Sequence, residues 1–131
     1  MSEKLDNFSN DSVEKKHQDV IDSIGENFGE ELEILRARGG EFALRADGIE
    51  RLVLDIRGKL LRIKDIESSN QGSGEGTHMI EALIATAEEL GYELWAENVR
   101  PEYDSWWRER GFAPPAEDKH SADYVYNGAE S

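Results

Sequence analysis

The sequence contains no cysteine, which excludes disulfide bonds, thiolate zinc sites and a cysteine nucleophile. Basic residues are also scarce: 15 Lys and Arg stand against 29 Asp and Glu, giving a formal net charge of -14. A field of that sign repels nucleic acids and anionic membranes, so we expect neither as a partner. No apolar run approaches the roughly 20 residues of a membrane span, and residues 1–16 lack the apolar stretch of a secretory signal. We therefore expect a cytoplasmic protein.

Apolar residues make up only 37% of the chain, yet 131 residues suffice for one hydrophobic core. We predict a single domain over residues 11–127, with a flexible polar arm before it (1–10) and a polar tail after it (128–131). The charge is uneven, because residues 41–69 carry six bases and six acids whereas residues 70–112 carry three and nine. Such an acid-rich, lysine-poor composition fits a plain acidic protein or one adapted to high salt.

The first part of the domain has the spacing of an amphipathic helix. Apolar residues recur at steps of three and four over residues 13–35, which predicts helical structure. Gly25 and Gly29 interrupt this pattern, at about 1 kcal/mol each in a helix interior. Two helices, 11–26 and 29–38, therefore fit the pattern as well as one.

A strand region follows. Alternating apolar and polar residues over 41–67 predict three antiparallel strands in a meander, with turns at Asp47-Gly48 and Gly58-Lys59. In the third of these strands the two phases of alternation are mixed, so the pattern does not decide which side faces the core.

The remaining residues predict alternating helices and strands. A clean apolar face predicts a helix over 77–90, and alternation predicts strands over 92–97 and 122–126, with a short helix over 103–110 between them. The whole order is helices-β-β-β-α-β-α-β, which predicts a mixed α/β (α+β) fold.

The sharpest feature is the Gly-rich loop that joins the third strand to the helix over 77–90. Gly72, Gly74 and Gly76 would let a ligand approach the backbone, and the helix start adds the positive end of its dipole. Together they predict an anion seat, most naturally for a pyrophosphate. The spacing is neither the dinucleotide fingerprint nor the P-loop, which needs a lysine. A Gly-rich turn without a ligand is the alternative.

The loop Gln71-Gly72-Ser73-Gly74-Glu75-Gly76 fits the pattern Q/R-x-x-G-x-G/A and resembles motif A of the GNAT superfamily of N-acetyltransferases. The segment from Trp107 to Gly111-Phe112 is similar to that family's aromatic-x-x-x-Gly-Phe ending. The resemblance implies a GNAT-like mixed, mainly antiparallel sheet with helices on both faces. It also implies acetyl-CoA as co-substrate, with its pyrophosphate on the loop amides. Its acyl arm would lie where the strand before the loop splays from the next parallel strand.

The resemblance assigns roles to individual residues. The implied cofactor-binding residues are Ile66, Glu67, Ser68, Gln71, Gly72, Ser73, Gly74, Glu75, Gly76, Thr77 and Asn98. Glu75 departs from the family, which has an apolar or basic residue there, and adds a negative charge beside the pyrophosphate. Trp107 stands where the family often has a general-acid tyrosine, and Tyr103 is the nearest substitute.

An amine must lose a proton before it attacks a thioester, and a carboxylate can accept that proton directly or through water. Asp65 and Glu67, on the strand before the loop, are the candidate bases, and Tyr103 is the candidate acid. A solvent-facing strand acid is the alternative for either carboxylate. Trp106 and Trp107 are predicted core residues, and no cluster of His, Asp and Glu has metal-ligand spacing, so we expect no metal.

These features predict an N-acetyltransferase that moves an acetyl group from acetyl-CoA directly to a primary amine, since no cysteine can carry it. The acceptor would be a small molecule or a protein, and the acidic surface favours a cationic one. We expect a monomer or a homodimer. Two alternatives stay open: a catalytically degenerate GNAT-fold module that binds CoA or regulates, and an acidic interaction protein for a basic partner.

Overall fold

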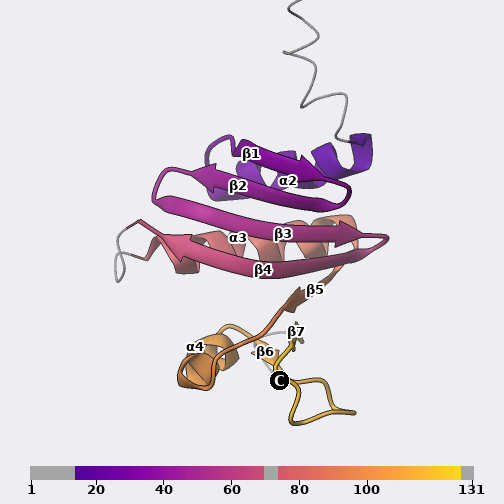
Figure 1. Cartoon of the computed structure of the whole chain (residues 1–131), viewed down its shortest axis with the longest axis vertical. Coiled ribbons are helices and arrows are strands. Elements are labelled where there is room, and N and C mark those ends of the chain that lie inside the picture. Colours follow the sequence, from indigo (N-terminus) through magenta and orange to yellow (C-terminus); the bar gives the residue numbers. More distant parts are fainter. Residues whose placement is uncertain (1–13, 70–73, 128–131) are drawn as a thin grey trace, which may run out of the picture.

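The computed structural model describes residues 14–69 and 74–127, in which seven strands form one sheet of order β1-β2-β3-β4-β5-β7-β6 (Figure 1). The strands are β1 (Glu33–Arg38), β2 (Glu41–Ala46), β3 (Ile49–Arg57), β4 (Leu60–Ser68), β5 (Glu93–Ala96), β6 (Phe112–Ala113) and β7 (Tyr124–Tyr126). The helices are α2 (Lys15–Phe28), α3 (Glu75–Leu90), the 3₁₀ turn η1 (Pro101–Tyr103) and α4 (Asp104–Glu109). All neighbouring strands are antiparallel except β4 and β5, which are parallel. The predicted mixed, mainly antiparallel α/β sheet is confirmed.

The predicted helix over 29–38 is wrong. α2 ends at Phe28 with Gly29 as its C-cap (φ 104), and strand β1 follows. Gly25 does not interrupt α2, and its carbonyl accepts hydrogen bonds from the N–H groups of Gly29 and Glu30 at the end of the helix. The chain then returns close to Gly25, where an added Cβ would lie 2.9 Å from the carbonyl oxygen of Glu30. The described order is therefore α-β-β-β-β-α-β-α-β-β, with a fourth strand ahead of the three predicted ones and β6 before the last.

The mixed phase of the third predicted strand, β4, has a structural cause. The register between β3 and β4 shifts at Lys64, which is an extra residue in β4. This bulge lets Ile63 and Ile66 both face the core although they are three positions apart. It also places Asp65 and Glu67 on the opposite face of the sheet, where both lie beside an arginine of β3.

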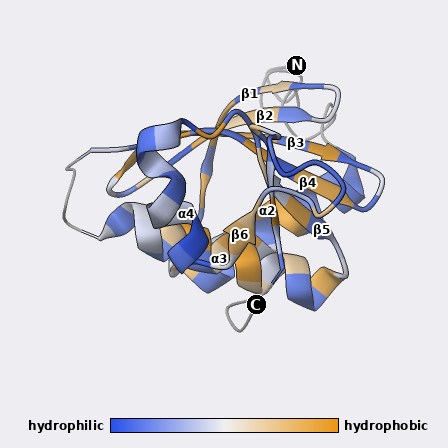
Figure 2. Ribbon diagram, turned by 90° about the horizontal axis from the view of Figure 1, so that it is seen from below, coloured by the Kyte–Doolittle hydropathy of each residue, from blue (hydrophilic) through white to orange (hydrophobic). Residues whose placement is uncertain are grey.

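α2 and α3 lie together on one face of the sheet (Figure 1). A buried polar contact joins them: Ser23 Oγ and Asn27 Nδ2 lie 3.2 Å and 3.1 Å from Thr86 Oγ1. In the view from below, apolar residues lie on the strands and on α3 (Figure 2). Over the opposite face of β1–β4 lies no helix of the described residues, so helices on both faces of the sheet stay a prediction.

The core between sheet and helices is a single cluster that runs from Val20 in α2 to Tyr124 in β7. Its largest fully buried side chains are Phe42, Phe112, Ile24, Leu44, Ile49, Leu52, Leu54, Ile56, Leu61, Met79, Ile80 and Leu83. Trp107 of α4 is also buried and packs edge-on against Phe112 of β6, with ring centroids 5.0 Å apart. The predicted core role of Trp107 is confirmed, and Trp106 is partly buried beside it. The predicted arm (1–10) and tail (128–131) lie outside the described residues.

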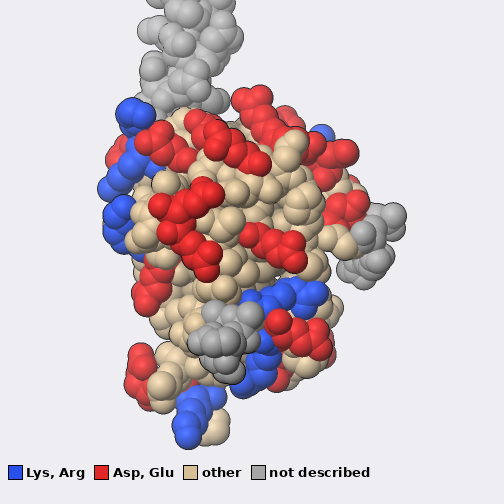
Figure 3. All heavy atoms as spheres, turned by 180° about the vertical axis from the view of Figure 1, so that it is seen from behind, with Lys and Arg blue, Asp and Glu red and all other residues tan. Residues whose placement is uncertain are grey.

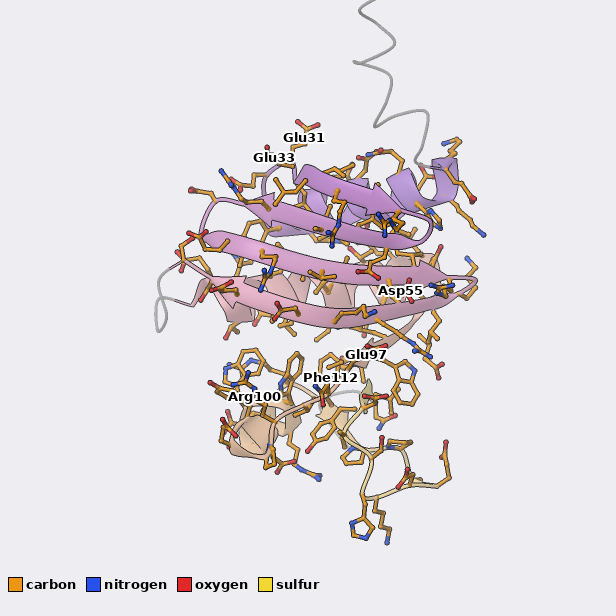
Figure 4. All side chains as sticks on the ribbon, in the orientation of Figure 1. Glu31, Glu33, Asp55, Glu97, Arg100 and Phe112 are labelled. Carbon is orange, nitrogen blue, oxygen red and sulfur yellow. The ribbon has the colours of Figure 1, made fainter. Side chains whose placement is uncertain are left out.

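Charged side chains are distributed differently on the two sides. On the helix-free face they pair across strands: Arg62 Nη1 lies 3.0 Å from Glu97 Oε2, and Lys64 Nζ lies 3.5 Å from Glu41 Oε1. Asp55, labelled in Figure 4, is buried on this same face. From behind, on the side of the two long helices, acidic side chains cover much of the surface (Figure 3). Opposite charges are therefore paired across strands on the helix-free face, and acidic side chains are prominent on the helix side.

Candidate functional site

The parallel strands β4 and β5 separate after a short pairing. Within the described ranges their ladder ends at Ile63 and Ala96, and a last bond runs from the Glu97 N–H to the Ile63 carbonyl at 2.9 Å. β4 then continues to Ser68, whereas the chain beyond β5 turns at Asn98, whose φ is 56°. Backbone groups on this side of the second half of β4 are left without a β5 partner, which makes them available to a ligand.

The start of α3 lies just beyond the end of β4 in the chain. Gly74 is the N-cap with φ 94°, and no side chain caps the first turn. The first amides of a helix have no partner within the helix and form its positive end. Around Gly76 the space is open, since an added Cβ would meet no atom within 4 Å. Three of the predicted loop ligands, Gln71, Gly72 and Ser73, lie outside the described residues.

Glu75 and Thr77 point to different sides of α3. The side chain of Glu75 packs against Gly48 in the turn between β2 and β3, so closely that Gly48 has no room for a Cβ. Thr77 lies two residues on, about 200° around the helix, and its Oγ1 accepts a hydrogen bond from Arg110 Nη2 at 2.8 Å. The carboxylate that departs from the family pattern is thus directed toward the β2–β3 turn.

The two candidate bases share one arginine. Arg51 Nη2 donates to Asp65 Oδ2 at 2.7 Å and lies 3.6 Å from Glu67 Oε1, and both carboxylates are half-exposed. Asp65 is therefore engaged by a short hydrogen bond, whereas Glu67 is beyond hydrogen-bond distance from that donor. Of the other predicted residues on this strand, Ile66 packs against the core and Ser68 ends β4.

Tyr103 and Asn98 lie on the far side of the strand separation, after β5. Tyr103 ends the 3₁₀ turn η1 rather than lying within the short helix as predicted, and 49% of its surface is exposed. Asn98 is exposed, and its backbone N–H donates to Asp123 Oδ1 at 2.9 Å. The structure assigns no contact between these two residues and the carboxylates of β4, so their joint role in one site stays a prediction.

A cluster around Asp104 was not predicted. The Tyr124 hydroxyl donates to Asp104, and Arg108 Nε donates to the same carboxylate at 2.8 Å. These two bonds, that of Tyr124 first, hold the pKa of Asp104 below its ordinary value. Burial, followed by the bond to Asp104, raises the pKa of Tyr124. The Asp104–Arg108 spacing of four residues on a helix could have predicted half of this cluster, but Tyr124 lies 20 residues away in the sequence.

An open acidic groove lies at the other end of the Gly-rich segment, next to Ser69. It has a volume of about 530 Å³. Its charged lining residues are Glu30, Glu31, Glu33, Asp47 and Glu50, with Arg45 as the base among them. Glu31 and Glu33 lie together near the start of β1 (Figure 4). Ser69 is tied to this groove by its N–H, which donates to the Gly48 carbonyl at 2.9 Å.

Comparisons with protein-family models, with curated proteins and with solved structures found no match to this chain. In the described ranges no group of three His, Asp or Glu could hold a metal ion. No helix in those same ranges is long and apolar enough to cross a membrane. The features of the molecule that point to a function are therefore the strand separation, the start of α3 and the residues around them.

Proposed function

We propose that the protein is an acyl-CoA-dependent N-acyltransferase, most simply an acetyltransferase, of the GNAT type. The separation of β4 from β5 immediately before a Gly-rich segment and an uncapped helix start is the observation that favours this function. The resemblance of residues 71–76 to motif A implies that this helix start holds a pyrophosphate. The same resemblance implies that the acyl arm lies where β4 has lost its β5 partner, bordered by Ile66, Glu67 and Ser68.

The acidic groove supports a cationic amine as the acceptor. Five carboxylates against one arginine create a negative potential, which attracts a polyamine or a basic peptide and raises its local concentration. The groove adjoins Ser69, and therefore the end of β4 at which the thioester is proposed to lie. An acceptor held there would approach from the strand end, on the side of the turn that carries Gly48.

In this proposal the chain's own groups manage protons and orientation. Glu67 accepts the amine proton, directly or through water. Glu67 suits this role better than Asp65 because Arg51 lies 2.7 Å from the Asp65 carboxylate but 3.6 Å from that of Glu67. Acetyl-CoA supplies a thioester whose C–S bond breaks as the new C–N bond forms, and the sulfur leaves as a thiolate. A proton from Tyr103 or from solvent converts that thiolate to the thiol. Half-exposed Tyr103 is open to this exchange.

The decisive experiment compares two substitutions at Gly76. Gly76→Ala adds a methyl group into open space and keeps acetyl-CoA binding, whereas Gly76→Asp places a carboxylate at the proposed pyrophosphate seat and abolishes it. An acid in the first turn of a helix is compatible with the helix dipole, so the variant should fold. At acetyl-CoA 100 times its Kd, the wild type should gain about 2.7 kcal/mol, or about 10 °C in Tm for a domain of this size.

Other outcomes select the alternatives. Binding of acetyl-CoA without thiol release from any amine, polyamine, lysine peptide or N-terminal peptide would select the non-catalytic module. The buried Trp107, which stands where the family often has a tyrosine, favours that alternative. No binding of acetyl-CoA, together with salt-sensitive binding of a basic protein, would select the acidic interaction protein, which the acidic helix side favours (Figure 3).

A further inference from the structure

Arg110 is the described arginine whose surroundings are hardest to explain by the fold alone. It follows α4 directly, and only 20% of its side chain is exposed. Nη1 donates to the Trp106 carbonyl at 2.7 Å, and the guanidinium lies over the Trp106 ring, 3.8 Å from its centroid. Nη2 donates to Thr77 Oγ1 at 2.8 Å. The side chain is thus held from three sides against the start of α3.

The charge of Arg110 has little compensation. Four other arginines, Arg51, Arg57, Arg62 and Arg108, each have a carboxylate oxygen between 2.7 and 3.0 Å away. For Arg110 the corresponding carboxylate is that of Glu109, at 3.7 Å and on a 75% exposed side chain. In a chain with almost twice as many acids as bases, a mostly buried arginine without a close carboxylate is unexpected.

The position of Arg110 makes this charge more costly. Its partner Thr77 is in the first turn of α3, where the helix dipole is positive and a cation is unfavourable. A guanidinium has five N–H donors, and the bonds to Trp106 and Thr77 use two of them. Nε is buried and has no partner within the described residues. The guanidinium of Arg110 and the positive end of α3 therefore lie close together, and both keep N–H donors without a partner within the described residues. A bound anion would stabilise this arrangement.

We propose that Arg110 is a binding residue for the phosphates of the acyl-CoA, donating to a pyrophosphate oxygen from the α4 side while the α3 amides donate from the other. This inference rests on the proposed function and adds to it a residue outside the Gly-rich motif. Arginine suits this task because its planar donors match phosphate oxygens in pairs. The Trp106 ring and Thr77 fix the guanidinium before the ligand arrives, which lowers the entropic cost of binding.

The test measures Kd by calorimetry for the wild type, Arg110→Gln, Arg110→Lys and the control Arg108→Gln. Three probes are used: acetyl-CoA, inorganic pyrophosphate, and S-acetylpantetheine, which lacks the pyrophosphate. Arg110→Gln should weaken acetyl-CoA and pyrophosphate about 10- to 100-fold, the range for a hydrogen bond to a charged group. Arg110→Lys should lose less, because it keeps the charge. The Kd of S-acetylpantetheine should change by no more than about twofold in any of the variants. The control Arg108→Gln should bind all three probes within about twofold of the wild-type Kd.

The outcomes separate this inference from the proposed function. If the wild type binds acetyl-CoA and folded Arg110→Gln binds it equally well, Arg110 has no ligand role and the proposed function stands. Equal losses for acetyl-CoA and S-acetylpantetheine would show that Arg110 only supports the fold, which overturns the inference. If the wild type does not bind acetyl-CoA, the proposed function fails, and the pyrophosphate titrations alone decide on the role of Arg110. If the wild type binds neither acetyl-CoA nor pyrophosphate, the proposed function and the inference about Arg110 are both overturned. Should Arg110→Gln not fold, unchanged pyrophosphate affinity in Arg110→Lys overturns the inference and a loss supports it.

Discussion

Replacing a helical glycine by alanine should lower the free energy of unfolding at Gly25 and raise it at Gly76. Gly25 lies inside α2, where alanine is ordinarily better than glycine by about 1 kcal/mol. An added Cβ at Gly25, however, would lie 2.9 Å from the carbonyl oxygen of Glu30 and 3.5 Å from Cα of Glu31. Both contacts are with backbone, which cannot rotate away as a side chain can. At Gly76, in the first turn of α3, the added methyl would meet nothing within 4 Å.

The expected magnitudes follow from these distances. Forcing a methyl group against packed backbone costs about 1–3 kcal/mol, so Gly25→Ala should lower the free energy of unfolding by up to about 2 kcal/mol after the helix gain. Gly76→Ala should raise it by about 0.5–1 kcal/mol. Since 1 kcal/mol moves Tm by about 3–5 °C in a domain of this size, the two variants should differ by several degrees.

Urea unfolding followed by far-UV circular dichroism measures both variants against the wild type. Equal m-values would show that the substitutions act on stability and not on the compactness of the unfolded chain. A Gly25→Ala variant as stable as Gly76→Ala would refute the close return of the chain after α2. In that case Gly25 would be an ordinary helix residue and the path from α2 into β1 would need revision.

Three further predictions concern titrating and catalytic groups. The pKa of Asp104 is lowered in the fold, so its bonds stabilise the protein at pH values above its ordinary pKa near 3.9, and this stabilisation is lost as pH falls through the lowered pKa. The difference in free energy of unfolding between wild type and Asp104→Asn should therefore shrink on acidification to pH 2.5. A constant difference would contradict the assignment. The pKa of Tyr124 is raised, so its contribution to stability is lost only as pH rises through that raised value; absorbance at 295 nm should show a late-ionising tyrosine that is missing from Tyr124→Phe. Under the proposed function, Glu67→Gln should slow thiol release about 100-fold or more with unchanged acetyl-CoA affinity, while Asp65→Asn should have the smaller effect; the reverse order would exclude Glu67 as the base.

Much of the sheet could be predicted from alternation, and the main error has a physical cause. β1 was predicted as a helix because its neighbourhood shows apolar residues at steps of three and four. In the structure Ile34 and Ala37 both pack against the core, and they are three apart because the register with β2 shifts between Ile34 and Arg36. A bulge in a strand therefore produces the spacing of a helix, and a short segment offers too few residues to tell the two apart.

The candidate site was predictable where its parts are adjacent in the sequence and not where they are distant. Gly74, Gly76 and Thr77 could be placed at a helix start because the loop and the helix pattern are contiguous. Arg110 could not, because its contact with Thr77 spans 33 residues and depends on how α4 docks. Nor does any local pattern reveal that Glu75 packs on Gly48, since that contact joins the start of α3 to the turn between β2 and β3.

The single extra residue in β4 has a consequence for how this protein can change. Lys64 has no partner in β3, so removing it would place Ile63 and Asp65 next to each other opposite Leu54 and Val53, which are already neighbours. The ladder would become regular, Ile63 and Ile66 would be two positions apart, and both would still face the core. Asp65 and Glu67 would keep their place beside Arg51 on the helix-free face. Insertions and deletions are usually tolerated in loops and damaging in strands, but at this position the loss of one codon would remove only the bulge and leave the pair of acids beside the strand separation.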